Sequence, residues 1–344
     1  MEQMQNDVQI IGLLKTLNLE EKQTRKGRDA IMGDAVIEVT DKFNHVNNIR
    51  VNIFAFQLTK SGSQSKLYTG FETVMNEYKT IDNDGRSEAD YVRVTGSLDS
   101  NIYSSHGAIH YSNRIRAVFF SRLKKEEIDE QKSLCTIGVY VQKFDEAIDA
   151  DGNPLGYSNI TAFSVGYNGT VIPIFNLTIS GKVEKQFRSY YVPGSTGIMT
   201  FRMNNYAKPK EKDEDVEEHG FGSSEEVGTP QVDYVNNKEV TGGHLPFEDD
   251  KALTPDEGAN LIKQFHEMIN QAKENANDGF ENNTGFESKK SDDEVKKDTN
   301  DALDTMFGKD DSKEESKQNA PTPTDDDAPA SEDSDEFKSF MSQI

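Results

Sequence analysis

The sequence contains no tryptophan, one cysteine and few apolar residues, and each shortage excludes a class of protein. Hydrophobic residues make up only 34% of the 344 positions, which is low for a chain that folds along its whole length. No run approaches 18 consecutive apolar residues, so we expect no membrane-spanning helix. The first ten residues lack a basic region followed by an apolar run, and we therefore expect no signal peptide. The single Cys135 cannot form an internal disulfide, so a reducing cytoplasm is the expected compartment.

Motifs of catalysis and metal binding are also missing. The sequence has no GxxxxGK[ST], GxSxG, HExxH or CxxC motif, and its six histidines are scattered. The stretch from Asp149 to Asn153 resembles the start of a calcium loop, but Ile160 stands at the twelfth position, where a glutamate would be needed. A hairpin turn is the expected structure there. We therefore expect a protein that is not an enzyme and needs no cofactor and no metal.

The excess of acidic over basic side chains is confined to the C-terminal part of the chain. Residues 1–208 contain 24 basic and 24 acidic side chains, whereas residues 209–344 contain 14 basic and 37 acidic ones, a net charge of −23. The low isoelectric point of the whole chain therefore does not exclude a nucleic-acid ligand for the neutral part.

Strand and helix patterns recur twice in the same order. Three alternating runs precede a helical pattern over residues 65–81, and two more runs follow; the order then begins again, with a basic connector over 181–191. This is the layout of the OB-fold, whose sharply bent strands would explain Gly12, Gly33 and Gly96. The expected fold is mainly β, with two tandem OB-fold-like barrels, a helix and a disordered acidic tail. The expected boundaries are 1–122 for the first barrel, 123–133 for a linker, 134–246 for the second barrel with an acidic insertion near 209–228, 247–273 for an amphipathic helix and 274–344 for the tail.

The amphipathic helix has clear signals at its start. Thr254 is a natural N-cap, Pro255 follows at the first helical position, and Glu257 completes a capping box. The next residues form one apolar stripe, which consists of Leu261, Ile262, Phe265, Met268, Ile269 and Ala272. We expect this stripe to pack on its own domain; the alternative is a helix that binds a partner.

Three strands carry arginines and aromatic residues on the face opposite their apolar face. In residues 48–58, for example, Val51, Ile53 and Ala55 alternate with Arg50, Phe54 and Phe56. Rings can stack on bases and cations can pair with phosphates, whereas the plainer alternative is core or dimer packing for the rings and solvated arginines. The candidates for single-stranded DNA binding are Lys22, Arg25, Lys26, Arg28, Arg50, Phe54, Phe56, Tyr91, Arg93, Arg114 and Arg116 in the first unit, and Tyr140, Lys185, Arg188, Tyr190, Tyr191 and Arg202 in the second.

Three segments resemble the single-stranded DNA-binding proteins of bacteria and phages. They are the opening strand VQIIGLLKTL, the strand YVRVTGSL after the helix, and the acidic tail with its apolar tip EFKSFMSQI. The resemblance implies sequence-tolerant binding and protection of single-stranded DNA during replication and recombination, with the tail recruiting replication and recombination proteins. The docking residues would be Phe337, Phe340, Met341 and Ile344, which have helical spacing. The doubled domain looks most like a phage replication protein from a Gram-positive host, working in the host cytoplasm.

The sequence departs from these proteins in two respects. Their tails usually end in a Pro-Phe-type tip, which is absent here, and without tryptophan any base stacking rests on Phe and Tyr. The alternative function is that of a structural, virion or assembly protein with β domains and an acidic scaffold-like tail. That alternative explains the β-rich body and the tail equally well, but not the arginines and aromatics that share the polar faces of three strands.

Overall fold

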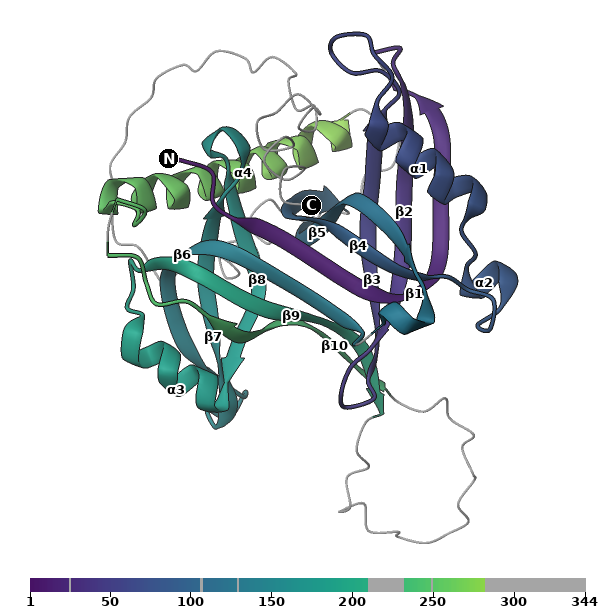
Figure 1. Ribbon diagram of the computed structural model, residues 1–344. Coiled ribbons are helices and arrows are strands. Elements are labelled where there is room, and N and C mark those ends of the chain that lie inside the picture. The colour runs from purple at the N-terminus through teal and green to yellow at the C-terminus, as the bar shows by residue number, and fades with distance from the viewer. Residues whose placement is uncertain (25, 106–107, 129, 210–231, 249, 282–344) are drawn as a thin grey trace, which may run out of the picture.

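The computed structural model describes residues 1–281 except 25, 106–107, 129, 210–231 and 249 (Figure 1). The expected acidic tail over 282–344, its four docking residues, Arg25 and most of the expected acidic insertion therefore lie outside the described residues. Within the described part no helix is long and apolar enough to cross a membrane.

The first five strands close into a barrel. They are β1 (Asn6–Gln23), β2 (Asp29–Thr40), β3 (Val46–Phe56), β4 (Tyr91–Ser105) and β5 (Ala108–Leu123). Their order around the barrel is β1-β2-β3-β5-β4, and β4 returns to pair with β1. All pairs are antiparallel except β3 and β5, which meet in parallel at Asn52 and Arg116. The helices α1 (Lys66–Glu77) and α2 (Ile81–Asp84) connect β3 to β4. This order, with a helix between the third and fourth strands, is that of an OB-fold.

The next five strands repeat this arrangement. They are β6 (Lys132–Ile148), β7 (Pro154–Val165), β8 (Val171–Ser180), β9 (Thr196–Pro209) and β10 (Val232–Gly243). Their order is β6-β7-β8-β10-β9, β9 closes onto β6, and the parallel pair is β8 with β10. Helix α3 (Gly181–Tyr190) takes the place of α1. The predicted mainly β fold with two OB-fold-like barrels and a C-terminal helix is confirmed.

Glycines allow the strands of the first barrel to approach closely. A Cβ atom on Gly96 would collide with the carbonyl oxygen of Arg116, and one on Gly33, whose φ is +152°, would collide with that of Asn18. At both positions a neighbouring backbone passes where a side chain would otherwise lie, so only glycine fits, as expected for a strongly bent strand.

The two barrels share one sheet and one core. Strand β1 pairs antiparallel with β6 from Asn6 opposite Ile137 to Ile11 opposite Lys132. The inward residues of both barrels, among them Ile10 and Cys135, form a continuous buried cluster. The expected linker contains the short 3-10 helix η1 (Lys125–Glu127), and the Gln131 side chain after it accepts a hydrogen bond from the Thr40 backbone N–H at 2.7 Å.

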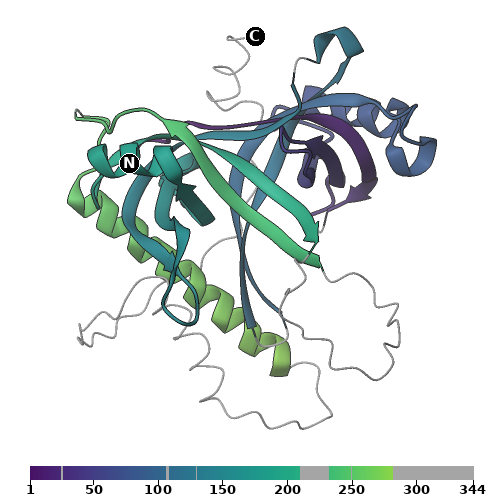
Figure 2. The ribbon, with the colours of Figure 1, turned by 90° about the horizontal axis from the view of Figure 1, so that it is seen from below.

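Each barrel also extends its fourth and fifth strands onto the other barrel. From the first barrel, Asn113 on β5 donates to the Pro173 carbonyl at 2.8 Å and accepts from the Phe175 N–H at 2.9 Å. From the second barrel, the Asn205 N–H on β9 donates to Asn47 Oδ1 at 2.8 Å, and Tyr206 stacks on His45 with ring centroids 4.1 Å apart. Figure 2 shows β9 and β10 extending toward the first barrel. The barrels are therefore locked together by reciprocal contacts.

Helix α4 (Pro255–Glu281) covers one side of the second barrel (Figure 1). Thr254 and Glu257 form the predicted capping box, with the Glu257 N–H donating to Thr254 Oγ1 at 3.3 Å and the Thr254 N–H to Glu257 Oε2 at 2.9 Å. The stripe led by Leu261, Phe265 and Ile269 is buried against β6, β7 and β8. The packing prediction is thus confirmed.

The predicted start of this helix, directly after the Thr254 cap, is confirmed, whereas the predicted end at residue 273 was placed too early. The chain becomes helical only at Pro255, after its cap, and the helix continues to Glu281. Lys273, Glu274 and Ala276 are good helix formers, so nothing ends the helix where the expected acidic tail was placed.

Candidate nucleic-acid interface

Two phenylalanine rings lie on the outer surface of the first barrel. Alternation along β3 buries Ile53 and Ala55 and turns Phe54 and Phe56 outward, where both side chains stay half-buried. Their rings meet edge to face with centroids 4.9 Å apart. The Arg28 guanidinium lies 3.6 Å above the centre of the Phe56 ring and donates to the Leu58 carbonyl at 3.1 Å. The structure therefore places an aromatic pair and a stacked cation on one open surface.

Further arginines lie on the same face. Arg50 lies on β3 and is 71% exposed, with its Nε 3.4 Å from Asp34 Oδ2. On β5, alternation buries Ile115 and turns Arg114 and Arg116 outward. Arg116 is in register with Asn52 of β3, and Arg114 Nη2 lies 2.9 Å from Asp99 Oδ2. We call this surface the β3 face; it consists of Arg28, Arg50, Phe54, Phe56, Arg114 and Arg116.

Other first-barrel candidates lie apart from the β3 face. Tyr91 and Arg93 are on β4, which β5 separates from β3. The Arg93 Nε is buried and has no hydrogen-bond partner in the part of the chain that the structure describes. Lys22, near the end of β1, forms an ion pair with Glu20, and Lys26 lies exposed in the connection to β2.

Two tyrosines predicted to bind DNA belong to the core instead. Tyr140 is buried under α4, where the backbone of Gly258 lies against its ring. Tyr191 is 4% exposed, stacks on Phe187 at 4.7 Å and donates its hydroxyl to the His244 carbonyl at 2.9 Å. Burial raises the pKa of the Tyr191 hydroxyl to about 12. Both assignments were wrong, because a neighbouring element covers the strand or helix end that each residue occupies.

The remaining second-barrel candidates do not form one surface. Lys185, Arg188 and Tyr190 are exposed on α3, which lies on the other side of the second barrel from α4 (Figure 1). Arg188 is held by Glu184 at 3.0 Å and by the Ser158 hydroxyl at 2.7 Å. The hydrogen bond from Ser158, with help from Arg188, holds the pKa of the Glu184 carboxyl below its ordinary value.

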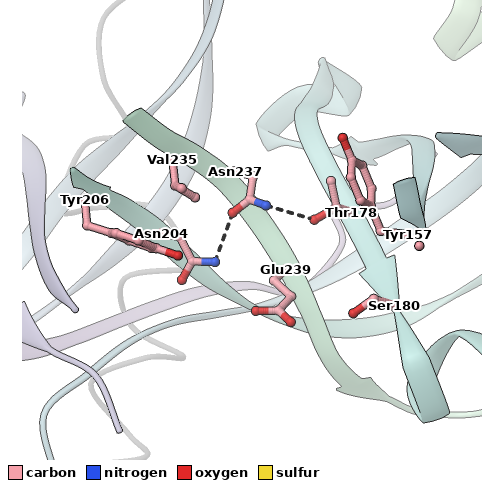
Figure 3. A pocket seen from close by; sticks show the side chains of 9 residues that line it. Tyr157, Thr178, Ser180, Asn204, Tyr206, Val235, Asn237 and Glu239 are labelled. Atoms are coloured by element: carbon pink, nitrogen blue, oxygen red, sulfur yellow. Dashed lines mark hydrogen bonds between the residues drawn. The ribbon is translucent and has the colours of Figure 1, made fainter. Parts of the chain in front are cut away.

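Arg202 lies elsewhere, on β9, with its Nη2 2.5 Å from Glu239 Oε2. It borders a polar groove of about 300 Å³ on the outer surface of β7, β8, β9 and β10, which the sequence analysis missed (Figure 3). The groove is lined by Tyr157, Thr178, Asn204, Tyr206, Asn237 and Glu239. These residues come from four strands, so only the strand order brings them together. By that order the groove occupies the position in the second barrel that the β3 face occupies in the first.

No described residues form a cluster of three or more His, Cys, Asp and Glu side chains that could hold a metal ion. The Asp149–Asn153 stretch forms the predicted hairpin turn, in which Asp149 Oδ1 accepts from the Asn153 N–H at 2.8 Å. The side-chain and backbone hydrogen bonds from Asn153 hold the pKa of the Asp149 carboxyl below its ordinary value.

Comparison with solved structures finds similar folds at low identity. Wild-type single-stranded DNA binding protein from Thermus aquaticus is 11% identical, with 74% of this chain and 99% of that chain covered and a TM-score of 0.44. A Plasmodium falciparum SSB in complex with ssDNA is 12% identical, covering 36% of this chain and 99% of that chain at a TM-score of 0.24. At these scores the fold assignment rests on the strand pairing described above, and not on the similarity.

Comparison by sequence gives a family. No curated protein matches the chain. The model of the YorF family, in contrast, matches residues 5–276, which include both barrels and most of α4. The chain therefore belongs to the YorF family.

Proposed function

We propose that this protein binds single-stranded DNA without strong sequence preference, through the β3 face of its first barrel. The observation that carries this proposal is the Phe54–Phe56 pair, with the Arg28 guanidinium stacked on Phe56 and further arginines beside it. Half-buried rings on an outer strand face offer flat surfaces to unstacked bases, and in an OB-fold the second and third strands commonly form the ligand face.

The binding energy comes from two sources. Each base stacked on a ring contributes about 1–3 kcal/mol, and each arginine that meets a phosphate releases counterions. The bases of duplex DNA are stacked inside the helix, so duplex can place phosphates on the arginines but cannot stack bases on the phenylalanine rings. A preference for single strands over duplex follows.

The wider role in this proposal is protection of single-stranded DNA during replication and recombination, in a phage-encoded protein that acts in the host cytoplasm. Residues 274–344 contain 21 acidic and 8 basic side chains, and this net charge of −13 supports a tail that does not itself bind DNA. The apolar side chains Phe337, Phe340, Met341 and Ile344 would then dock onto replication or recombination proteins.

The experiment replaces both rings by alanine. In the Phe54→Ala/Phe56→Ala variant, affinity for fluorescently labelled oligo-dT should fall by about 2–6 kcal/mol, because two stacks are lost. Tyr190→Ala, which removes a more exposed ring from α3 and outside the β3 face, is the control and should bind as wild type does.

A Phe54→Leu/Phe56→Leu variant keeps apolar bulk on the face while removing both rings, so it separates lost stacking from lost folding. Circular dichroism melting checks that each variant is folded. Unchanged oligo-dT affinity in both double variants would show that the β3 face is not the binding surface.

A further inference from the structure

The groove of the second barrel has a floor of side-chain amide and hydroxyl groups (Figure 3). Asn204 Nδ2 donates to Asn237 Oδ1 at 2.9 Å, and Asn237 Nδ2 donates to Thr178 Oγ1 at 3.2 Å. Asn204 and Thr178 are buried at 7% and 8% exposure. The floor is therefore a fixed polar surface, not a set of freely solvated side chains.

One carboxylate oxygen in this groove remains available to a ligand. Arg202 reaches Glu239 through Oε2 at 2.5 Å, and the same arginine donates from Nε to Asn204 Oδ1 at 3.1 Å. No described hydrogen bond or ion pair uses the other oxygen, Oε1. The groove thus presents a strong hydrogen-bond acceptor beside a chain of amides.

This charge distribution disfavours phosphate in the groove. The nearest guanidinium, that of Arg202, has only 19% of its side chain exposed and is already engaged by Glu239. A phosphate placed here would meet a carboxylate, and none of the described residues that line the groove is a cation that could offset the repulsion. A neutral base carries no negative charge, so the Glu239 carboxylate does not repel it in this way.

Two tyrosines lie toward opposite ends of the groove. Figure 3 shows Tyr157 on the side of Thr178 and Tyr206 beside Asn204. One face of the Tyr206 ring already stacks on His45, with an interplanar angle of 4°. A volume of about 300 Å³ is at the lower end of the range for ligand pockets, so it suits one base or nucleoside and not a longer stretch of chain.

We propose that this groove takes a single nucleobase that bears an exocyclic amino group, and that it disfavours uracil and thymine. The inference rests on the proposed single-stranded DNA binding. The amino group of cytosine would donate to Glu239 Oε1, as carboxylates accept from that group in base recognition. Uracil and thymine present a carbonyl oxygen at the same position, which would face the carboxylate unfavourably.

Oligo-dC and oligo-dU are the matched probes at neutral pH, because neither base carries a methyl group and the two differ at the amino-bearing edge. Wild-type protein should bind oligo-dC about tenfold more tightly than oligo-dU. Glu239→Gln should bring the two affinities within about twofold, because the amide can also donate to the uracil carbonyl. Glu248→Gln, an equal charge change at an exposed position outside the groove, should keep the tenfold preference.

Tyr157→Ala gives a second variant that leaves the Arg202–Glu239 pair intact. It should weaken oligo-dC binding several-fold and leave oligo-dU binding unchanged, because uracil does not occupy the groove. Equal binding of both probes by wild type, or a preference that survives in Glu239→Gln, would overturn this inference while the proposed function stands. Binding of neither probe would overturn both.

Discussion

The two barrels share one strand order but present different outer faces. On the first barrel, the β3 face is open and carries arginines around the Phe54–Phe56 pair. On the second, the corresponding surface is divided between α4, which covers Phe163 and Phe175, and the polar groove around Glu239. The same topology therefore supports a cationic, aromatic surface in one copy and a helix-covered, polar surface in the other. Side chains, and not the fold, determine what each barrel can bind.

The largest predicted change is a loss of stability when the packing of α4 on the second barrel is disrupted. Phe265 of α4 is 0% exposed and packs against Phe163 at 5.6 Å and Phe175 at 6.1 Å. Phe265→Ala should lower the free energy of unfolding by about 3–5 kcal/mol, as measured by chemical denaturation.

Phe43→Ala is the matched control, since Phe43 is 58% exposed on the connection between β2 and β3. Its unfolding free energy should stay within about 0.5 kcal/mol of wild type. A small effect of Phe265→Ala would mean that α4 is not an integral part of the second barrel.

A smaller change in the free energy of unfolding should come from Lys238, a half-buried lysine of the second barrel. Lys238 of β10 points into the second barrel and donates to the Phe175 carbonyl at 2.7 Å. Desolvation lowers the pKa of its ammonium to about 8. Below that pH the folded protein holds a charged group in an apolar environment, which destabilises it by about 3 kcal/mol relative to an unfolded chain with an ordinary lysine pKa.

Lys238→Met should therefore raise the free energy of unfolding at pH 7 by about 2–3 kcal/mol. Because a lowered lysine pKa means that the unfolded chain binds more protons between about pH 8 and 10, wild type should gain stability relative to the variant over that range. The quantity to measure is the difference in unfolding free energy between wild type and Lys238→Met as a function of pH. Burial also raises the pKa of the Cys135 thiol, but this thiol is present in both proteins, so its contribution cancels in the difference. Lys185→Met, on the exposed surface of α3, serves as the control. The explanation would be contradicted if the difference in unfolding free energy between wild type and Lys238→Met did not become smaller between about pH 8 and 10.

Features set by local periodicity could be predicted from the sequence. Alternation along β3 correctly assigned Ile53 to the core and Phe54 to the outer surface, because the period of two in a strand leaves only these choices. The start of α4 was also predictable, since the capping box of Thr254 and Glu257 is a local interaction.

Features that depend on distant contacts could not be predicted. Tyr140 alternates like a surface residue, but α4 covers that face of β6, and no local pattern separates a covered face from an open one. The buried Tyr191 hydroxyl has its hydrogen-bond acceptor 53 residues away, at the His244 carbonyl, and no local pattern reveals that partner. The groove joins Tyr157 to Glu239 through strand register that the sequence does not reveal. Whether the β3 face binds DNA stays a prediction.

The most direct test of that prediction compares labelled oligo-dT with duplex of the same length, titrated with the full-length protein at several salt concentrations. Oligo-dT should bind at least tenfold more tightly than duplex, because only single strands can place bases on Phe54 and Phe56. Its affinity should fall as salt rises, through the phosphate contacts of the arginines. Equal affinity for single strand and duplex at every salt concentration would contradict the stacking account.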